Sequence, residues 1–392
     1  AMKAYSKYLV GADGPGSTVS KSLGVHFDGL VNLARTRSIL FQAPGLFEQI
    51  AKLHGTTHQY QIVRKSYCLA GLVAVDPHRD LWTMPMLIGD AARTDNAEKV
   101  IAEVIGTTNF TLFQDRAWYW NFFLARDFRV GNVFLAGDAA HSWPPFGGTG
   151  GNTCYGDSFS LGWRLVMACR GEGSEALLDG YAVERRQHAL QTAMFVLRFA
   201  PRPELLKRFY SPIFEKPFVR AWMVAAWRFK NSGSHNQNHF AQIGLQYGIK
   251  YNYSPTVQTE PILPPDDSVC HYLPTIMGGA KLPFLKLIAQ DDSFQHIAKD
   301  TYTLLYIQRE AEDPDLERAH AQQQLFRAAF EMRKRRLHTA TLCLAPDPKK
   351  NTSRYEITKL YAKESLILVR PDRIVAWRLP RGAQWRGVGA SV

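Results

Sequence analysis

The stretch Gly131-Asn-Val-Phe-Leu-Ala-Gly-Asp138-Ala-Ala-His-Ser-Trp-Pro-Pro145-Phe-Gly-Gly-Thr-Gly-Gly-Asn152 decides how this chain is organised. Residues 133–136 are an apolar run that predicts a buried strand, and Asp138 follows at its carboxyl end, where open α/β sheets place ligands. Two prolines stiffen the next loop, and four glycines let backbone N–H groups approach a ligand. A helical pattern begins at Asn152, a candidate N-cap, and a helix start behind such a loop stabilises negative charge. The stretch therefore predicts a ligand site.

A second informative stretch lies near the N-terminus. Residues 8–19, Tyr-Leu-Val-Gly-Ala-Asp-Gly-Pro-Gly-Ser-Thr-Val, predict a strand, a turn that carries Asp13, and a helix start with Ser17 as a candidate cap. Asp13 and Asp138 thus each follow a predicted strand.

These stretches resemble the Asp-Gly motif and the second FAD-binding motif of the flavoprotein aromatic hydroxylases, the group A FAD-dependent monooxygenases of the phenol hydroxylase and hydroxybenzoate hydroxylase type. Gly-Asp-Ala-Ala-His, the proline-glycine loop, Asn152, Gly156-Asp157 and Trp163-Arg164-Leu165 fall in register with the second motif. Ser20 stands where the family usually has arginine, which puts the contact to a nicotinamide nucleotide in doubt. The resemblance implies that Asp138 binds the ribityl chain and that the loop lies against the isoalloxazine ring. The implied cofactor-binding residues are Asp13, Asp138, Pro145, Gly147, Gly148, Gly150 and Asn152.

The family's first βαβ unit with its G-x-G-x-x-G motif has no counterpart in this sequence. Ala1 precedes Met2 as a cloning remnant would, so we expect a natural start at Met2; a trimmed chain or one half of a split protein is the alternative. Because that unit would hold the pyrophosphate, we expect no tightly bound cofactor in this chain alone.

The predicted fold class is α/β (α+β), with an incomplete FAD-binding domain of the hydroxybenzoate hydroxylase type, an antiparallel-sheet substrate domain and a C-terminal thioredoxin-like domain. Strands are predicted within 37–42, 58–63, 67–75, 81–86 and 118–125, and helices at 98–105 and 174–199. The last part alternates strand 302–307, helix 315–332, strand 339–344, helix 355–362 and strands 366–370 and 374–379. The predicted domains are residues 1–25 with 130–200 (FAD-binding), 26–129 (substrate), 201–255 (helical) and 256–392 (thioredoxin-like).

Composition limits the functional classes. The 392 residues carry a formal net charge of +12, yet Lys and Arg are scattered and no nucleic-acid motif accompanies them, so we expect a solvated surface. The five cysteines show neither a CxxC motif nor a metal-ligand spacing. No apolar run is long enough to span a bilayer. We therefore expect a cytoplasmic protein without a metal site and without nucleic-acid or membrane partners; the aromatic segment 201–255 is predicted to be core or a homodimer surface.

Three functions remain open. The first is an enzyme of flavin-monooxygenase fold that has lost FAD and catalyses a redox-neutral cyclisation, isomerisation or dehydration of an aromatic or polyketide-like natural product. The second is an FAD- and NAD(P)H-dependent aromatic monooxygenase completed by a missing N-terminal segment, and the third is a non-catalytic pseudoenzyme. The candidate catalytic residues are His141, Asp138, Tyr60 and Tyr119, which could move a proton while the loop amides stabilise an oxyanion.

For His141 there is also a structural alternative, in which its side chain only bonds the backbone of the loop and takes no part in catalysis. The run Leu178-Asp-Gly-Tyr181-Ala-Val-Glu184-Arg-Arg186 resembles another family segment, and its arginines are expected to pair with Glu184 and neighbouring carboxylates rather than to do chemistry.

Overall fold

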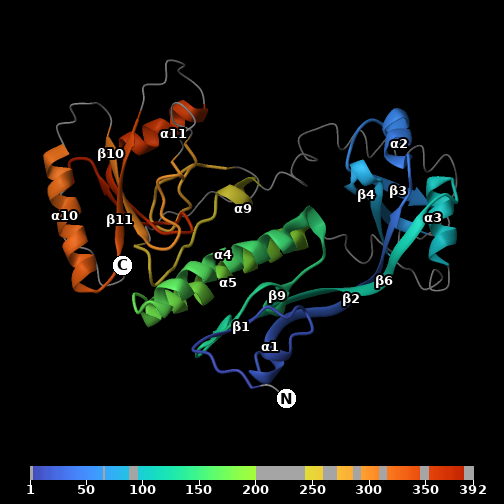
Figure 1. The fold of residues 1–392 in the computed structure, drawn as a ribbon, viewed down its shortest axis with the longest axis horizontal. Coiled ribbons are helices and arrows are strands. Elements are labelled where there is room, and N and C mark those ends of the chain that lie inside the picture. The colour runs from blue at the N-terminus through green and yellow to red at the C-terminus, as the bar shows by residue number, and fades with distance from the viewer. Residues whose placement is uncertain are drawn as a thin grey trace. The chain divides into compact units, whose positions relative to one another are not determined.

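The structure, a computed structural model, describes residues 3–64, 67–87, 96–199, 243–258, 272–285, 293–308, 316–344 and 353–383. These residues form two compact units (Figure 1). The first contains the described residues up to Asp28, those of 124–198 and those from 243 onward, and the second contains those from Gly29 to Phe123 together with Phe199. Of the predicted helical segment 201–255, only 243–255 is described, and it holds the short helix α9 (Ile243–Tyr247).

The first unit begins with a small sheet in the order β1-β8-β7. Its strands are β1 (Leu9–Gly11), β7 (Arg129–Val130) and β8 (Val133–Leu135), and helix α1 (Thr18–Ser22) follows β1. Strand β1 pairs with β8 in parallel, with Gly11 opposite Leu135, so the carboxyl ends of both strands lie at one edge. Both predicted strands are confirmed.

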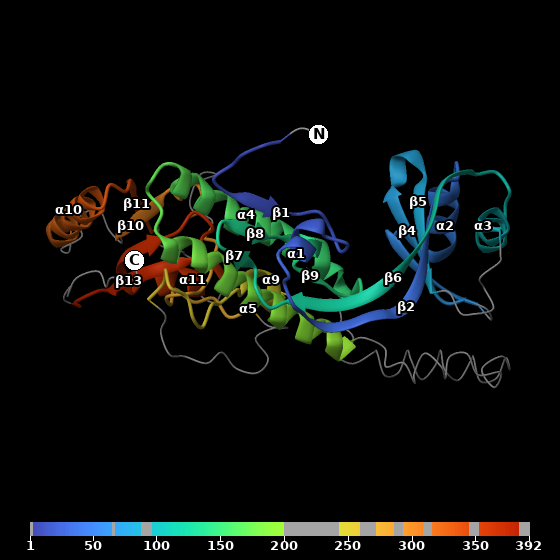
Figure 2. The ribbon, with the colours of Figure 1, turned by 90° about the horizontal axis from the view of Figure 1, so that it is seen from below.

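Two long helices carry the middle of the first unit. They are α4 (Thr149–Cys169) and α5 (Glu175–Phe199), which run side by side in both views (Figures 1 and 2). Between β8 and α4 lie the short turns η3 (Gly137–Ala139) and η4 (Phe146–Gly148) and the two-residue strand β9 (His141–Ser142).

The C-terminal part is a four-stranded mixed sheet in the order β11-β10-β12-β13. Its elements are β10 (Tyr302–Gln308), α10 (Leu316–Met332), β11 (Leu337–Cys343), α11 (Ser353–Ala362), β12 (Glu364–Val369) and β13 (Val375–Pro380). Strand β10 is parallel to β11 and antiparallel to β12, which is antiparallel to β13. This β-α-β-α-β-β order confirms each predicted strand and helix of this region and the thioredoxin-like arrangement.

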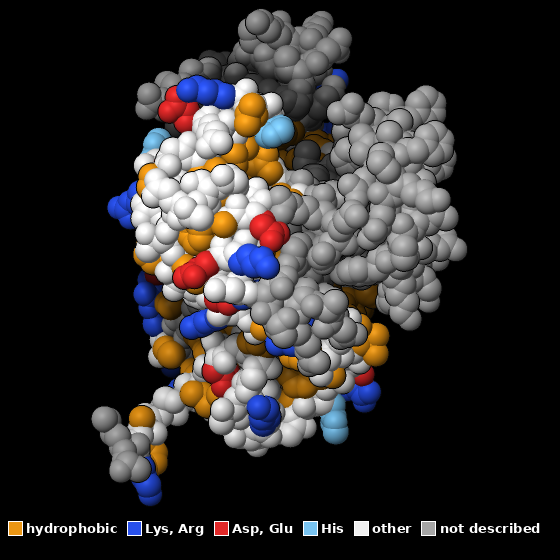
Figure 3. Space-filling model, turned by 90° about the vertical axis from the view of Figure 1, so that its right-hand side faces the viewer, with side chains coloured by type: hydrophobic (Ala, Val, Ile, Leu, Met, Phe, Trp, Pro, Cys, Tyr) orange, Lys and Arg blue, Asp and Glu red, His pale blue; other side chains and the backbone are white. Residues whose placement is uncertain are grey.

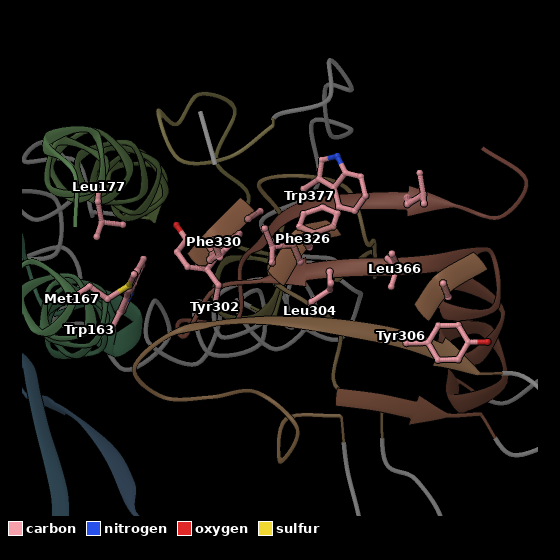
Figure 4. Close-up of a cluster of buried hydrophobic side chains, with 14 residues drawn as sticks. Trp163, Met167, Leu177, Tyr302, Leu304, Tyr306, Phe326, Phe330, Leu366 and Trp377 are labelled. Atoms are coloured by element: carbon pink, nitrogen blue, oxygen red, sulfur yellow. The ribbon is translucent and has the colours of Figure 1, made fainter. Parts of the chain in front are cut away.

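Alternating residues of this sheet face two cores. Leu304 and Leu366 pack with α10 and with α4 and α5, where Trp163, Met167 and Leu177 lie beside Tyr302 (Figure 4). The intervening residues of β10 and β12 pack on the opposite face, against α11 and residues 276–285. The sheet is therefore buried on both faces, which explains why β12 is apolar almost throughout.

The second unit is built on a six-stranded sheet in the order β3-β4-β5-β2-β6-β9, of which β9 and the ends of β2 and β6 belong to the first unit. Its remaining elements are β2 (Phe27–Gln42), α2 (Leu46–His54), β3 (Gln59–Arg64), β4 (Tyr67–Asp76), η1 (Pro77–Arg79), β5 (Leu81–Leu87), α3 (Ala97–Ile105) and β6 (Thr111–Ala125). Strands β3, β4, β5 and β2 are antiparallel neighbours. The five predicted strands are confirmed, although β2 and β6 are longer than expected, and α2 was not predicted.

Charges are dispersed on the described surface. In Figure 3, Lys and Arg side chains lie singly among acidic and apolar ones on the visible described face. Within the described ranges, no helix combines the length and the apolar character needed to cross a membrane.

Candidate functional site

The candidate site is the edge of the small sheet where β1 and β8 end. Asp13 lies two residues after β1 and Asp138 three residues after β8. Because the two strands are parallel neighbours, their carboxyl ends bring both turns to the same edge, the expected ligand position in such sheets. The structure therefore places the two predicted aspartates on adjacent turns.

Asp138 has an exposed carboxylate on a tight turn. Gly137, directly before it, has φ of 62°, and a side chain there would approach the Cys154 sulfur to 3.3 Å. The thiol of Cys154 donates to Asp138 Oδ1, with a sulfur–oxygen distance of 3.7 Å. Burial, together with the negative charges of Asp138 and Asp157, raises the pKa of Cys154 to about 12.

Asp13 is used locally. Its Oδ1 accepts a hydrogen bond from Ser17 Oγ (2.5 Å), and its Oδ2 accepts from the backbone N–H groups of Thr18 (2.7 Å) and Val19 (3.2 Å). The bond from Ser17 is the main reason why the pKa of Asp13 lies below its ordinary value. Ser17 also caps α1 through the N–H of Ser20, as predicted. Asp13 thus shapes the start of α1, and its contact to a cofactor stays a prediction.

A side-chain hydrogen bond joins the two ends of the glycine loop. Trp143 Nε1, before the two prolines, donates to Thr149 Oγ1 after the loop (2.9 Å). Inside the loop Pro145 is exposed, and Gly147 and Gly148 have φ of 69° and 63°. Nothing lies within 4 Å of a Cβ added at Gly148, so the loop presents bare backbone to open space.

Helix α4 starts three residues earlier than the sequence suggested. Its N-cap is Gly148, which makes no side-chain capping bond, so the prediction of Asn152 as N-cap is wrong. Asn152 lies in the first turn, and its amide Nδ2 donates to Gly148 O (2.8 Å). Because the first N–H groups of an α-helix lack partners within the helix, the start of α4 supplies its backbone donors earlier than the sequence suggested. The glycine-rich sequence before Asn152 concealed this start, since glycine disfavours helix interiors.

His141 is fully buried beneath the loop. Its Nε2 lies 2.7 Å from Asp157 Oδ2, and its ring stacks between Trp143 (4.7 Å between centroids) and Phe128 (6.0 Å). The hydrogen-bond partner of His141 Nε2 is thus the carboxylate of Asp157, whereas the structural alternative expected the loop backbone. A proton-transfer role for His141 stays a prediction, and the geometry gives the ring an orienting contact.

Asp157 and Arg185 form the centre of the site, although they were not among the predicted site residues. Arg185 Nε donates to Asp157 Oδ1 (2.7 Å), and the N–H of Gly137 donates to Asp157 Oδ2 (3.0 Å). Burial raises the pKa of Asp157, but the charge of Arg185 and the bond from His141 outweigh it and hold the pKa at about 2. The sequence did contain a signal for Asp157, because Gly156-Asp157 falls in register with the second FAD-binding motif.

The arginines of α5 pair with carboxylates, as expected, but their partners are Asp157 and Asp28 and not Glu184. Arg185 pairs with Asp157, and Arg186 lies 3.8 Å from an oxygen of Asp28. Glu184 instead pairs with Arg164 (2.7 Å) and Arg370 (2.6 Å). A second buried ionic cluster therefore joins α4 and α5 to the turn between β12 and β13.

The two predicted tyrosines belong to the second compact unit. The hydroxyl of Tyr60 donates to Gly55 O (3.0 Å), and its ring lies beside Trp82 (6.4 Å between centroids). Tyr119 lies on β6 and is 47% exposed. Their roles in proton transfer stay predictions.

Comparisons with known proteins find a domain family that matches the first half of the chain. Residues 3–196 match the FAD binding domain family. The chain is 35% identical to tetracenomycin B2 monooxygenase-dioxygenase of Streptomyces olivaceus over 46% of this chain and 34% of that protein. It is 27% identical to the uncharacterized aromatic compound monooxygenase YhjG of Bacillus subtilis, over 96% of this chain and 66% of YhjG.

A solved structure of the rebeccamycin biosynthetic enzyme RebC with reduced flavin matches 96% of this chain and 66% of RebC, with 28% identity and a TM-score of 0.75. The chain thus spans between one third and two thirds of the length of these relatives. The predicted resemblance is confirmed: residues 3–196 match the FAD binding domain family, and the similar proteins include enzymes of the flavin-dependent aromatic hydroxylase type.

Proposed function

We propose that this chain supplies the flavin-contacting turn and loop of an FAD-dependent hydroxylase that acts on an aromatic or polyketide-like natural product. One observation carries the proposal: Asp138 presents an exposed carboxylate at the carboxyl end of β8, in contact with the Cys154 thiol, whereas Asp157 in the same motif is buried and paired with Arg185. The relatives support the substrate class, since one is named for tetracenomycin B2 and another for rebeccamycin biosynthesis.

The residues fit the flavin end of FAD. The carboxylate of Asp138 is an acceptor, as hydroxyl groups of a ribityl chain require. The start of α4, capped by no side chain, offers backbone donors and the positive end of a helix dipole. A Cβ at Gly148 or Gly151 would meet no atom within 4 Å, so a flat ring can approach the backbone there.

In this proposal the bound flavin, reduced by NAD(P)H, supplies the oxygen activation needed to hydroxylate an aromatic ring. The chain's own residues bind and orient. Asp138 accepts a hydrogen bond from the ribityl chain, and backbone amides at the start of α4 stabilise negative charge that develops at the ring edge. The bridge from Trp143 to Thr149 fixes the loop so that these groups need no rearrangement.

A redox-neutral reaction on the same class of compound is the second candidate, favoured by one observation. Ser20, where the family usually has arginine, is buried, and its hydroxyl donates to Ser17 O (3.2 Å). It therefore offers no cation to a nicotinamide nucleotide. In this alternative the chain uses no flavin, and the amides at the start of α4 stabilise an oxyanion of the substrate.

The deciding experiment is a titration of the purified chain with FAD, followed by the absorption and fluorescence of the flavin. We expect saturable binding, and we expect Asp138→Asn to weaken it by about tenfold or more, the value of a hydrogen bond to a charged group. Asp127→Asn, which changes another exposed carboxylate of the same unit, should bind FAD as the wild type does. A wild-type chain that leaves the flavin spectrum unchanged would overturn the hydroxylase proposal. Turnover of an aromatic polyketide without gain of oxygen would then favour the redox-neutral one.

A further inference from the structure

The carboxylate of Asp157 is bonded on every side to groups that shape the candidate site. Its Oδ2 accepts from the N–H of Gly137 (3.0 Å) and lies 2.7 Å from His141 Nε2, while its Oδ1 accepts from Arg185 Nε (2.7 Å). Gly137 directly precedes Asp138, and His141 stacks on Trp143, which closes the glycine loop. A shift of this carboxylate would therefore move both the turn and the base of the loop.

Arg185 is itself held by three hydrogen bonds, one of which goes to Asp157. Besides Asp157, its guanidinium donates to Thr153 O in α4 (3.2 Å) and to the hydroxyl of Tyr251 (3.3 Å). Gly156 makes room for it, because a Cβ there would lie 2.8 Å from Arg185 Nη2. Since Arg185 is buried and each nitrogen of its planar fork donates to a different group, on α4 or near Tyr251, its position is tightly defined.

Stability alone is a weak reason for such an arrangement. A buried Arg–Asp pair loses much hydration, and apolar side chains of similar volume are often as stabilising. What apolar side chains cannot provide is an acceptor for the N–H of Gly137 at a fixed place. The geometry therefore points to a role in orienting the turn that carries Asp138.

We propose that Asp157 and Arg185 are positioning residues that hold the Asp138 carboxylate in its ligand-binding place, and that Tyr251 completes this device. The inference rests on the proposed function, in which Asp138 binds the flavin. The segment around Tyr251 lies about 100 residues after the glycine loop in the sequence, and in this proposal it helps to position Asp138 through Arg185.

The test uses Arg185→Lys, which keeps the positive charge but removes the fork that reaches Asp157, Thr153 and Tyr251 together. The matched control is Arg186→Lys, because Arg186 is the next residue of α5, is partly exposed and donates to Ala125 O. Two quantities are measured for each variant: the dissociation constant for FAD and the rate at which iodoacetamide alkylates Cys154, quantified on its peptide by mass spectrometry. Urea unfolding records stability separately.

Cys154 reports on the turn without any flavin. Its thiol contacts Asp138 in the wild type, and the neighbouring carboxylates help to keep it protonated. If Arg185→Lys displaces the turn, the thiol loses this contact, and its alkylation at about pH 8.5 should accelerate by roughly tenfold, the effect of one pKa unit. FAD binding should weaken by about the same factor, while Arg186→Lys changes neither quantity.

The outcomes separate the inference from the proposed function. Lower stability of Arg185→Lys with unchanged alkylation and unchanged FAD affinity would show a merely structural role and overturn the inference. Faster alkylation in Arg185→Lys combined with a wild-type chain that does not bind FAD would keep the positioning role and refute the flavin proposal.

A milder variant covers the case in which Arg185→Lys does not fold. Tyr251→Phe removes one hydroxyl from Arg185, and Tyr253→Phe is its control because Tyr253 is 65% exposed. We expect Tyr251→Phe to raise the alkylation rate of Cys154 and weaken FAD binding, each by a few fold. Identical values for both variants and the wild type would exclude Tyr251 from the device.

Discussion

Replacement of Glu184 by glutamine should destabilise the first compact unit severely. The buried carboxylate of Glu184 accepts from both terminal nitrogens of Arg370 (2.6 and 2.7 Å), from Arg164 (2.7 Å) and from Ser254 (2.5 Å). Burial raises the pKa of Glu184, but the charges of Arg370 and Arg164 lower it more, so the group is ionised. Two cations and two carboxylates, the second being Asp372, balance in this cluster.

The magnitude follows from the charge count. Glutamine keeps the shape of Glu184 but removes one negative charge, and it turns an amide donor toward guanidinium groups that also donate. One buried cation is then uncompensated, at a cost of about 3–5 kcal/mol. For a unit of this size we expect Tm to fall by on the order of 10 °C.

The assay is urea and thermal unfolding of the wild type, Glu184→Gln and the control Glu175→Gln. Glu175 pairs with Arg129, but its side chain is 77% exposed, so its loss should cost no more than about 1 kcal/mol. If Glu184→Gln unfolds within about 1 kcal/mol of the wild type, then the cluster is not held by charge pairing and the reasoning fails.

Two further predictions concern α4. The pKa of Asp157 is about 2 in the folded chain against an ordinary 3.8, so the stability it contributes is present above about pH 4 and is lost as the pH falls toward 2. Urea midpoints measured from about pH 7 to about pH 3 should fall less steeply in Asp157→Asn than in the wild type, and parallel curves would contradict the assignment. Gly156→Ala should destabilise, because its Cβ meets Arg185, whereas Gly162→Ala should stabilise by up to about 1 kcal/mol, since nothing lies within 4 Å and alanine favours helix. Equal unfolding midpoints for the two glycine variants would argue against the close approach of Arg185.

Local patterns were sufficient for most strands and helices. The apolar runs of β10 and β12 are buried on both faces, and such runs carry a strong strand signal. Helix α2 was missed because its cap is not local. The carboxylate of Asp80 accepts from the N–H groups of Gly45 (2.7 Å) and Phe47 (2.9 Å), and the residues that surround Gly45 contain no capping side chain.

Of the candidate site, only the exposed residues could be predicted from the sequence. The exposed Asp138 and the glycine loop follow from motif and backbone chemistry, which are local. The buried pairs of Arg185 with Asp157 and of Arg370 with Glu184 join residues 28 and 186 positions apart. Because charged side chains are mostly exposed, a sequence pattern gives them no partner until the fold is known.

The adjacent residues Glu184 and Arg185 explain why the C-terminal sheet and the candidate site share one compact unit. Neighbouring residues of an α-helix point roughly 100° apart, so each of the two can serve a different cluster. Glu184 binds Arg370 at the turn after β12, and Arg185 binds Asp157 beneath the Asp138 turn. Helix α5 thus fastens the sheet and the turn through successive side chains, and each cluster stays close to neutral on its own. A substitution in the buried ionic cluster of Glu184, Arg164, Arg370 and Asp372 should therefore lower stability first. It should alter ligand binding only if it also rotates or shifts α5.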